Sequence, residues 1–230
     1  MEESAAQAEE KLPHGYTNAT RRVGDDLVEK RYLGSRRFDN ARRELACLTA
    51  LADVVPVPRV VESDLDEPRL VIRWVDGDHG QELIEHGEGR TVMRLVGEMH
   101  RLLQSVPVSD VDLAGDGTVI CHGDFGAQNM LFDLAHGRVA AVIDWESAHF
   151  GAPVDDLAFA EWLVRMHHAD RVYILEDLFE GAGWRPSWEE RHTTMIRKCH
   201  EVLAFCEETG WNDSAEWWRE VIGVTSAWSE

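Results

Sequence analysis

CHGDFGAQNMLF, at residues 121–132, is the most informative segment of this chain, and VIDWE follows it at residues 142–146. The first segment holds Asp124 and, five positions later, Asn129; the second holds Asp144. An aspartate that accepts a hydroxyl proton, with an asparagine and a second aspartate that hold Mg²⁺ on nucleotide phosphates, is a division of labour used in phosphoryl transfer. The spacing therefore predicts a phosphoryl-transfer site in which Asp124 is the catalytic base and Asn129 and Asp144 are the metal ligands.

The flanking sequence predicts where these residues lie in the fold. Short apolar runs at residues 118–120 and 129–132 predict strands that lead into and out of a loop. Residues 139–143 form a third apolar run, which ends at Asp144. Both acids would therefore lie at strand ends, where rigid elements position the residues of binding and catalytic sites.

The two segments resemble the H-G-D-x-x-x-x-N and I-D-W/F-E elements of the aminoglycoside phosphotransferase and choline kinase superfamily, small-molecule relatives of the protein kinases. The resemblance implies an α+β, two-lobed protein-kinase-like fold. Its small N-lobe would hold an antiparallel sheet plus one helix, and its larger C-lobe would be mainly helical. We expect a flexible arm at residues 1–11, a nucleotide-binding N-lobe at residues 12–75, and a catalytic and substrate-binding C-lobe at residues 76–230.

The upstream chain supplies other parts of such a kinase in the expected order. GYTNAT at residues 15–20 resembles the nucleotide-covering loop of the family, and Lys30, on a strand predicted at residues 26–32, resembles the lysine that reaches the nucleotide phosphates. An amphipathic helix predicted at residues 40–51 places Glu44 where it can pair with Lys30. The resemblance thus assigns five residues to the nucleotide site: Gly15, Thr17, Asn18, Lys30 and Glu44.

A further strand resembles the hinge of the family. RLVIRWVDG, at residues 69–77, predicts a buried strand that runs into a glycine turn. The resemblance implies that the Arg73 carbonyl and the Val75 amide bind the adenine edge. ATP is the expected nucleotide, and GTP is possible because the nucleotide loop has one glycine where many relatives have two.

Three residues near the two acids have expected supporting roles. Asp156, in the GAPVDDLA segment at residues 151–158, matches a family position that braces the catalytic loop through backbone amides, although a helix cap would also suit it. His122 is expected to brace the loop as a packed ring beneath Asp124. Glu146 could hold the metal ligands in place without contacting the metal itself.

The rest of the chain is predicted to be mostly helical. Apolar residues recur at helical spacing between Thr91 and Ser105. More helices are expected around residues 155–167, 171–179, 188–208 and 215–224, which carry many acids and tryptophans. We expect some of those acids to face the substrate cleft and most of the tryptophans to be core residues.

The net charge of the chain limits the classes of molecule that it can bind. The formal net charge of −20 argues against nucleic acid, which is bound through clustered lysine and arginine. An acidic surface could attract a cationic acceptor toward a cleft, or it could merely solvate the protein. Sequence alone leaves both alternatives and the oligomeric state open.

Cysteine use and hydropathy predict the compartment. The four cysteines show no C-x-x-C spacing, which indicates buried, reduced thiols instead of a zinc site or a disulfide framework. No segment has the length and apolarity of a membrane span or a signal peptide, so we expect a cytoplasmic protein with no membrane partner.

The expected reaction is transfer of the ATP γ-phosphoryl group to a hydroxyl of a small molecule, with Mg²⁺ as cofactor, the acceptor being an aminoglycoside-like cationic antibiotic. One alternative is a kinase for a non-antibiotic metabolite such as an amino alcohol, sugar or nucleoside. Another is a nucleotide-binding regulatory protein without turnover, which the intact set of site residues disfavours.

Overall fold

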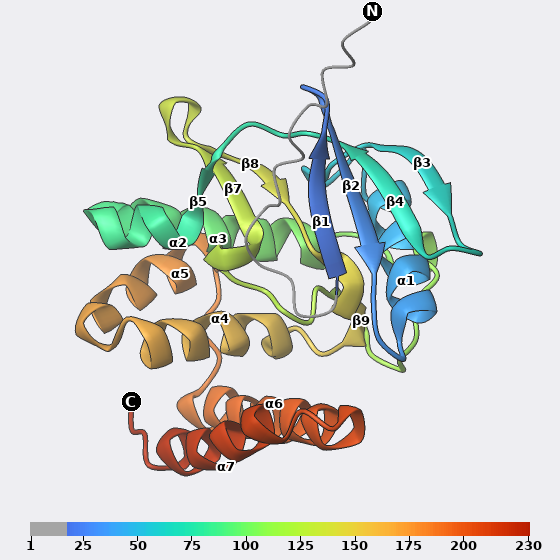
Figure 1. The fold of residues 1–230 in the computed structure, drawn as a ribbon. Helices are drawn as coiled ribbons and strands as arrows, with labels where there is room; N and C mark the ends of the chain where they lie inside the picture. Colours follow the sequence, from blue (N-terminus) through green and yellow to red (C-terminus); the bar gives the residue numbers. More distant parts are fainter. Residues whose placement is uncertain (1–17) are drawn as a thin grey trace, which may run out of the picture.

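A four-stranded antiparallel sheet and one helix make up the first lobe of the computed structural model, which describes residues 18–230 (Figure 1). The strands lie in the order β1-β2-β4-β3. Their bounds are β1 Asn18–Val23, β2 Leu27–Tyr32, β3 Val60–Asp64 and β4 Arg69–Arg73. In β2 the alternate residues Val28, Lys30 and Tyr32 are buried, as expected for one face of a strand that is covered by a helix.

That helix is α1, Arg37–Ala50, which begins three residues before the predicted segment. Ala41, Glu44, Cys47 and Leu48 are its buried members at helical spacing. The helix ends before the prolines of Val55-Pro56-Val57-Pro58, whose missing amide hydrogens cannot continue helical bonding. Glu44 therefore points from α1 toward β2.

The second lobe contains α3, Gly89–Gln104, packed against α5, Leu175–Ala182. Two glycines allow this contact. A β-carbon on Gly97 would lie 2.1 Å from the Leu178 carbonyl oxygen, and one on Gly181 would lie 2.1 Å from that of Arg94. The two backbones meet directly, so any larger residue at either position would force the helices apart.

Short strands of the second lobe carry the two motif segments, residues 121–132 and 142–146. One sheet has the order β5-β7-β8, and β6 pairs separately with β9. Their bounds are β5 Asp78–His79, β6 Val119–Cys121, β7 Met130–Asp133, β8 Arg138–Val142 and β9 His149–Gly151. The predicted strands at 118–120, 129–132 and 139–143 thus exist, each shifted by about one residue.

The remaining helices lie at the C-terminal end, where α6 and α7 pack side by side (Figure 1). Their bounds are α4 Val154–His167, α6 Trp188–Thr209 and α7 Asn212–Ser226. The helix predicted at residues 171–179 was wrong in its bounds, because a 3₁₀ segment, Ala169–Ile174, precedes α5. A short helix, α2 Gly80–Leu83, and a π-helical turn at Ile84–Glu88 were not predicted.

The predicted two-lobed α+β fold is confirmed. A main apolar core includes Leu48 and Leu70 of the first lobe and Phe125 and Trp145 of the second, so one core joins the two lobes. The boundary at residues 75–76 stays a prediction, and the arm expected at residues 1–11 lies outside the described residues.

Two further observations concern the cysteines and the helices. Cys47, Cys121, Cys199 and Cys206 are buried and unpaired, as predicted. Within residues 18–230, no helix combines the length and the apolar character that crossing a bilayer requires.

Candidate active site

The loop after β6 is held from below by Asp156. Its two carboxylate oxygens accept hydrogen bonds from the backbone amides of His122, at 2.7 Å, and Gly123, at 3.0 Å. Asp156 is fully buried and lies inside the first turn of α4, where it caps no helix. The bracing contact predicted for Asp156 is therefore confirmed, and the helix-cap alternative was wrong.

Gly123 allows the chain to turn at this point. Its φ of +85° lies in a region that other residues rarely adopt. A β-carbon would also lie 2.3 Å from the Ser147 carbonyl oxygen, so the loop and the segment after β8 are in backbone contact.

His122 links the loop to the end of β8. Its Nε2 lies 2.9 Å from the Ile143 carbonyl oxygen, and its Nδ1 accepts a hydrogen bond of 3.3 Å from the Asp124 amide. Because Nδ1 accepts, Nε2 carries the proton and donates to Ile143. The ring is fully buried and lies 4.6 Å from that of Trp145, centroid to centroid. His122 has the bracing position that the sequence predicted.

Two amide side chains orient the Asp124 carboxylate. Asn129 Nδ2 donates to Asp124 Oδ2 at 2.8 Å, and Gln128 Nε2 donates to Asp124 Oδ1 at 3.1 Å. Burial raises the pKa of Asp124 above its ordinary value, against the opposing effects of His122 and Asn129. The carboxylate is thus a stronger proton acceptor than an exposed aspartate, and it lines the main cleft.

Lys30 joins the two lobes through a pair of carboxylates. Its Nζ lies 2.6 Å from Glu44 Oε2 and 2.6 Å from Asp144 Oδ1. Burial alone would lower the pKa of Lys30, but Glu44, Asp144 and Glu146 outweigh it and raise that pKa. The Tyr32 hydroxyl also donates to Glu44 Oε2, at 2.7 Å. The predicted Lys30–Glu44 pair is therefore present, and Asp144 belongs to the same cluster.

Asp144 has an unusual backbone. Its φ of 68° is the one positive value among the described non-glycine residues. Left-handed backbone outside glycine costs about 1–3 kcal/mol and is concentrated at functional sites. Burial would raise the pKa of Asp144, but the Lys30 ammonium outweighs it and lowers the pKa. The half-buried carboxylate is therefore held ionised.

Glu146 and Asn18 close the same cluster. Glu146 Oε2 lies 4.0 Å from Lys30 Nζ and accepts a hydrogen bond of 3.3 Å from Asn18 Nδ2. Asn18 is the first residue of β1, so the structure places it in a strand and not in a loop. The predicted nucleotide residues Gly15 and Thr17 lie outside the described residues.

The predicted hinge residues lie between the lobes. Arg73 is the last residue of β4, and its amide bonds to the Arg59 carbonyl at 2.8 Å. Val75 lies two residues later, before β5 begins at Asp78. Their carbonyl and amide contacts with a nucleotide stay a prediction.

A cleft of about 1510 Å³ opens in front of Asp124. Its outer wall comes from β9, α4, α6, α7 and the segment after α6 and carries six aromatic side chains: Phe150, Phe159, Phe205, Trp211, Trp217 and Trp218. Arg43, Arg197 and Lys198, which also line the cleft, were not identified from the sequence. They belong to no motif, and only the packing of α1 and α6 brings them near the loop.

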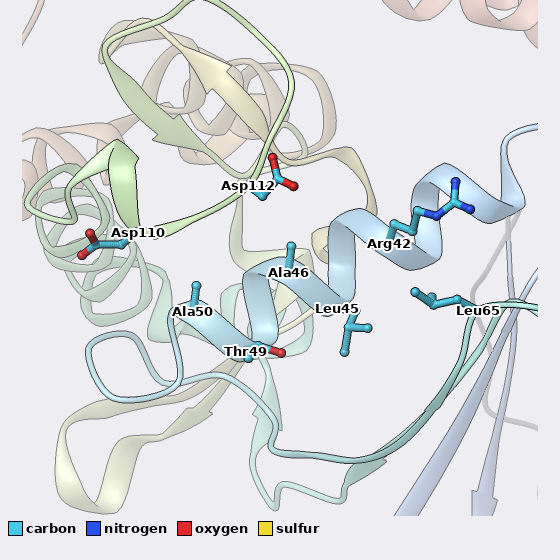
Figure 2. Close-up of a pocket in the computed structure, with 8 residues that line it drawn as sticks. All are labelled: Arg42, Leu45, Ala46, Thr49, Ala50, Leu65, Asp110 and Asp112. Carbon is cyan, nitrogen blue, oxygen red and sulfur yellow. The ribbon is translucent and has the colours of Figure 1, made fainter.

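A smaller cavity of about 450 Å³ lies along α1 (Figure 2). It is lined by Leu45 and Ala46 of the helix and by Asp110 and Asp112 of a distant loop. None of the predicted site residues lines it.

The two-lobed fold, the Lys30–Glu44 pair and the loop that carries Asp124 and Asn129 together define a phosphoryl-transferring enzyme. A model of the phosphotransferase enzyme family matches residues 9–119 and 113–192. Because these ranges span most of the chain, the protein belongs to the phosphotransferase enzyme family. The predicted enzyme class, a phosphotransferase, is confirmed.

Solved aminoglycoside phosphotransferases share the fold. Aminoglycoside 2'-phosphotransferase-IIIa, in its GDP complex, matches with a TM-score of 0.76 and 15% identity over 98% of this chain and 94% of that chain. A thermostable mutant of aminoglycoside phosphotransferase APH(4)-Ia, in a ternary complex with ADP and hygromycin B, matches with a TM-score of 0.68 and 18% identity over 96% and 95% of the two chains. At these identities, the likeness establishes the fold alone.

Two curated relatives match over shorter stretches. Acyl-CoA dehydrogenase family member 11 of Gallus gallus is 34% identical over 79 residues, 33% of this chain and 10% of the relative. Probable acyl-CoA dehydrogenase IBR3 of Arabidopsis thaliana is 26% identical over 126 residues, 54% of this chain and 14% of the relative. The matches thus span only a small part of each relative.

Proposed function

We propose that this protein transfers the γ-phosphoryl group of ATP to a hydroxyl of a small molecule bound in the main cleft. One observation supports the proposal. The buried Lys30 forms ion pairs with both Glu44 and Asp144, and Asp124 and Asn129 are hydrogen-bonded to each other on the catalytic loop. Lys30 would anchor the nucleotide phosphates, and Asp124 would orient the acceptor hydroxyl and take its proton. The complexes of structural neighbours with GDP and ADP support a nucleotide donor.

The donor set fits a hard divalent cation. Both side-chain hydrogen bonds described for Asn129 are made by Nδ2, so its amide oxygen can serve as a ligand. Asp144 uses Oδ1 for Lys30, which leaves Oδ2 as a second oxygen ligand. The backbone carbonyl of Asn129 accepts a hydrogen bond of 2.9 Å from the Ile143 amide. The segments that carry the two candidate ligands, Asn129 and Asp144, are therefore hydrogen-bonded to each other. Asn129 and Asp144 would hold Mg²⁺, which neutralises charge on the phosphates when bound.

The overall proposal is tested by measuring ATP consumption with a panel of hydroxylated amines, sugars and nucleosides, with and without Mg²⁺. We expect Mg²⁺-dependent and acceptor-dependent turnover. ATP binding without turnover on any acceptor would instead support the regulatory alternative, in which the fold binds nucleotide but performs no transfer.

Mg-ATP should stabilise the folded protein through Asp144. A ligand that binds only the native state adds about 2.7 kcal/mol at a hundredfold excess over its dissociation constant. Asp144→Ala should abolish this gain, as measured by thermal unfolding with and without Mg-ATP. The control is Asp133→Ala, since Asp133 ends β7 and pairs with Arg138 outside the cleft, and this variant should retain the gain. An equal gain in both variants would contradict the metal assignment.

The charge of the cleft supports a cationic acceptor. Four bases line the cleft: Arg36, Arg197 and Lys198 each pair with an acid, and Arg43 donates to the Glu146 carbonyl oxygen. Asp116 and Asp213 line the same cleft and have no ion pair among the described residues. Six acids and four bases line the cleft in all, so its side-chain charge is net negative, and the aromatic wall suits an ammonium group through cation–π attraction. These features favour an amine-bearing acceptor such as an aminoglycoside over a neutral sugar or nucleoside.

Salt should separate these acceptor classes. The Debye length falls from about 10 Å at 0.1 M to about 3 Å at 1 M ionic strength, so attraction to exposed carboxylates weakens. The KM of a cationic acceptor should rise over this range, while that of a neutral acceptor changes little. Steady-state kinetics at several salt concentrations provide the measurement. A best acceptor that is neutral, or whose KM ignores salt, would contradict the cationic assignment.

A further inference from the structure

Beside the catalytic loop, three side chains with metal-binding atoms converge from three separate segments. Cys121 and His149 are directly opposite each other in the β6–β9 pair, so their side chains lie on one face of that pair. Asp155 comes from the first turn of α4. One ligand atom of each residue lies within 4.8 Å of the other two.

Gly151 shows that the three atoms surround one small volume. A β-carbon built on Gly151 would lie 2.7 Å from Cys121 Sγ, 2.8 Å from Asp155 Oδ2 and 3.2 Å from His149 Nε2. These atoms therefore border the same small region beside Gly151, where the absence of a side chain leaves room for them to approach one another. Tetrahedral zinc, with bonds of about 2.0–2.3 Å, separates its ligand atoms by about 3.3–3.8 Å. The three atoms, within 4.8 Å of one another, would have to draw together by at most about 1.5 Å to reach that geometry.

The atoms around the triad favour coordination. His149 Nδ1 lies 3.0 Å from the Ser147 carbonyl oxygen, so Nδ1 donates its proton and Nε2 presents a lone pair to the site. Asp155 uses Oδ1 for Arg197, at 2.5 Å, and turns Oδ2 toward the triad. His149 and Asp155 thus each have an outer partner and an inner ligand atom. The inner atoms Asp155 Oδ2 and Cys121 Sγ contact the Ala152 amide at 3.1 Å and the Ala152 carbonyl oxygen at 3.5 Å, and an entering ion would replace the weak thiol contact.

The basic side chains near the three ligand atoms are paired with acids, so their charge does not exclude a metal ion. Arg197 pairs with Asp155 and Glu201, and Lys198 lies 3.7 Å from Glu201. Asp156, the buried acid that braces the catalytic loop, is the next residue along α4. The acids around the site therefore offset both basic side chains.

We infer that Cys121 Sγ, His149 Nε2 and Asp155 Oδ2 form a binding site for a zinc-class divalent cation, distinct from the magnesium site on Asn129 and Asp144. The mixture of thiolate, imidazole and carboxylate suits Zn²⁺ and Co²⁺ far better than Mg²⁺, which prefers oxygen ligands alone. The entering ion displaces the thiol proton of Cys121 to solvent, so binding releases one proton. His149, Gly151 and Asp155 all line the main cleft, so the fourth coordination position faces the cleft.

The position of the site suggests what the ion would do. Cys121 directly precedes His122 and Gly123, whose amides Asp156 holds, and Asp155 directly precedes Asp156. A bound ion would therefore clamp β6, β9 and α4 together beneath the catalytic loop. Its binding is independent of phosphoryl transfer, so it can be tested even if the acceptor is unknown or the proposed function fails.

Titration of the reduced full-length protein with Co²⁺ alone tests the site directly. We expect one equivalent to bind with a thiolate-to-cobalt charge-transfer absorption, which Zn²⁺ should bleach and excess Mg²⁺ should not. Loss of an outer partner alone lowers metal affinity by about 10–100-fold, so His149→Ala should weaken Co²⁺ binding by at least about 100-fold. Cys121→Ser should remove the charge-transfer absorption.

Two control variants show whether the loss of Co²⁺ binding is specific to the three proposed ligands. His136→Ala removes an exposed histidine that pairs with Asp133, and Cys206→Ser removes a cysteine outside the triad; both should bind Co²⁺ as the wild type does. His149 is only half-buried, so its variant should fold even if Cys121→Ser does not. Absence of the charge-transfer absorption in the wild type, or equal binding by wild type and His149→Ala, would overturn the inference.

Discussion

Asp124→Asn should lower kcat by roughly 10²–10⁴-fold, the usual contribution of a positioned general base. The substitution keeps the size of the side chain, so it removes proton acceptance while leaving the loop braced by Asp156. Nucleotide affinity should barely change, because Asp124 is assigned to the acceptor and not to the phosphates. Steady-state kinetics with the best acceptor, together with an ATP-binding measurement, separate the two effects.

The pH profile gives a second readout of the same residue. Burial raises the pKa of Asp124, and only the ionised carboxylate accepts a proton. Activity should therefore fall, as the pH is lowered, at a higher pH than an ordinary aspartate would give. Asp112→Asn, at an exposed aspartate in the smaller cavity, should leave both kcat and the profile unchanged. A kcat for Asp124→Asn within about tenfold of the wild type would remove Asp124 from the catalytic role.

The sequence predicted those helices and strands that are long enough to show a repeating pattern of apolar residues. The apolar spacing of α3 and the run that forms β8 follow helical and strand periods, and both elements exist within about two residues of the predicted bounds. The turn at α2 and the 3₁₀ segment before α5 are short and depend on what they pack against. Elements of that length contain too few residues to show a repeating pattern of apolar positions, so the sequence does not predict them.

Contacts within the site were predictable where the family resemblance names both partners, as for Lys30 with Glu44, and not where tertiary packing alone joins them. Asp124 and Asn129 were assigned to the site from their spacing on one loop, and the hydrogen bond between them was not predicted. The ion pair between Lys30 and Asp144 joins residues 114 positions apart, and only the packing of the two lobes creates it. The convergence of Cys121, His149 and Asp155 was missed for the same reason, because their spacing resembles no zinc motif and the β6–β9 pairing brings them together.

Lys30→Met should destabilise the protein by about 3–5 kcal/mol, the usual cost of breaking a buried ion pair by removing one partner. Lys30 and Glu44 are 6% and 2% exposed, so the remaining Glu44 carboxylate could not be solvated by water. Methionine keeps the length of the stem and its packing, so the loss should come from the unpaired charge. Chemical denaturation without nucleotide gives the free energy of unfolding.

Two further variants identify the cause of that loss. Lys30→Met combined with Glu44→Gln should recover part of the stability, because the buried charge is gone while Tyr32 can still donate to the amide oxygen. Arg59→Met breaks an ion pair with Asp53 in which the side chains are 61% and 89% exposed, and it should cost only about 0–1 kcal/mol. If Lys30→Met costs no more than Arg59→Met, the Lys30–Glu44 pair has no special energetic role, and the cluster that joins the lobes must be stabilised by its apolar neighbours instead.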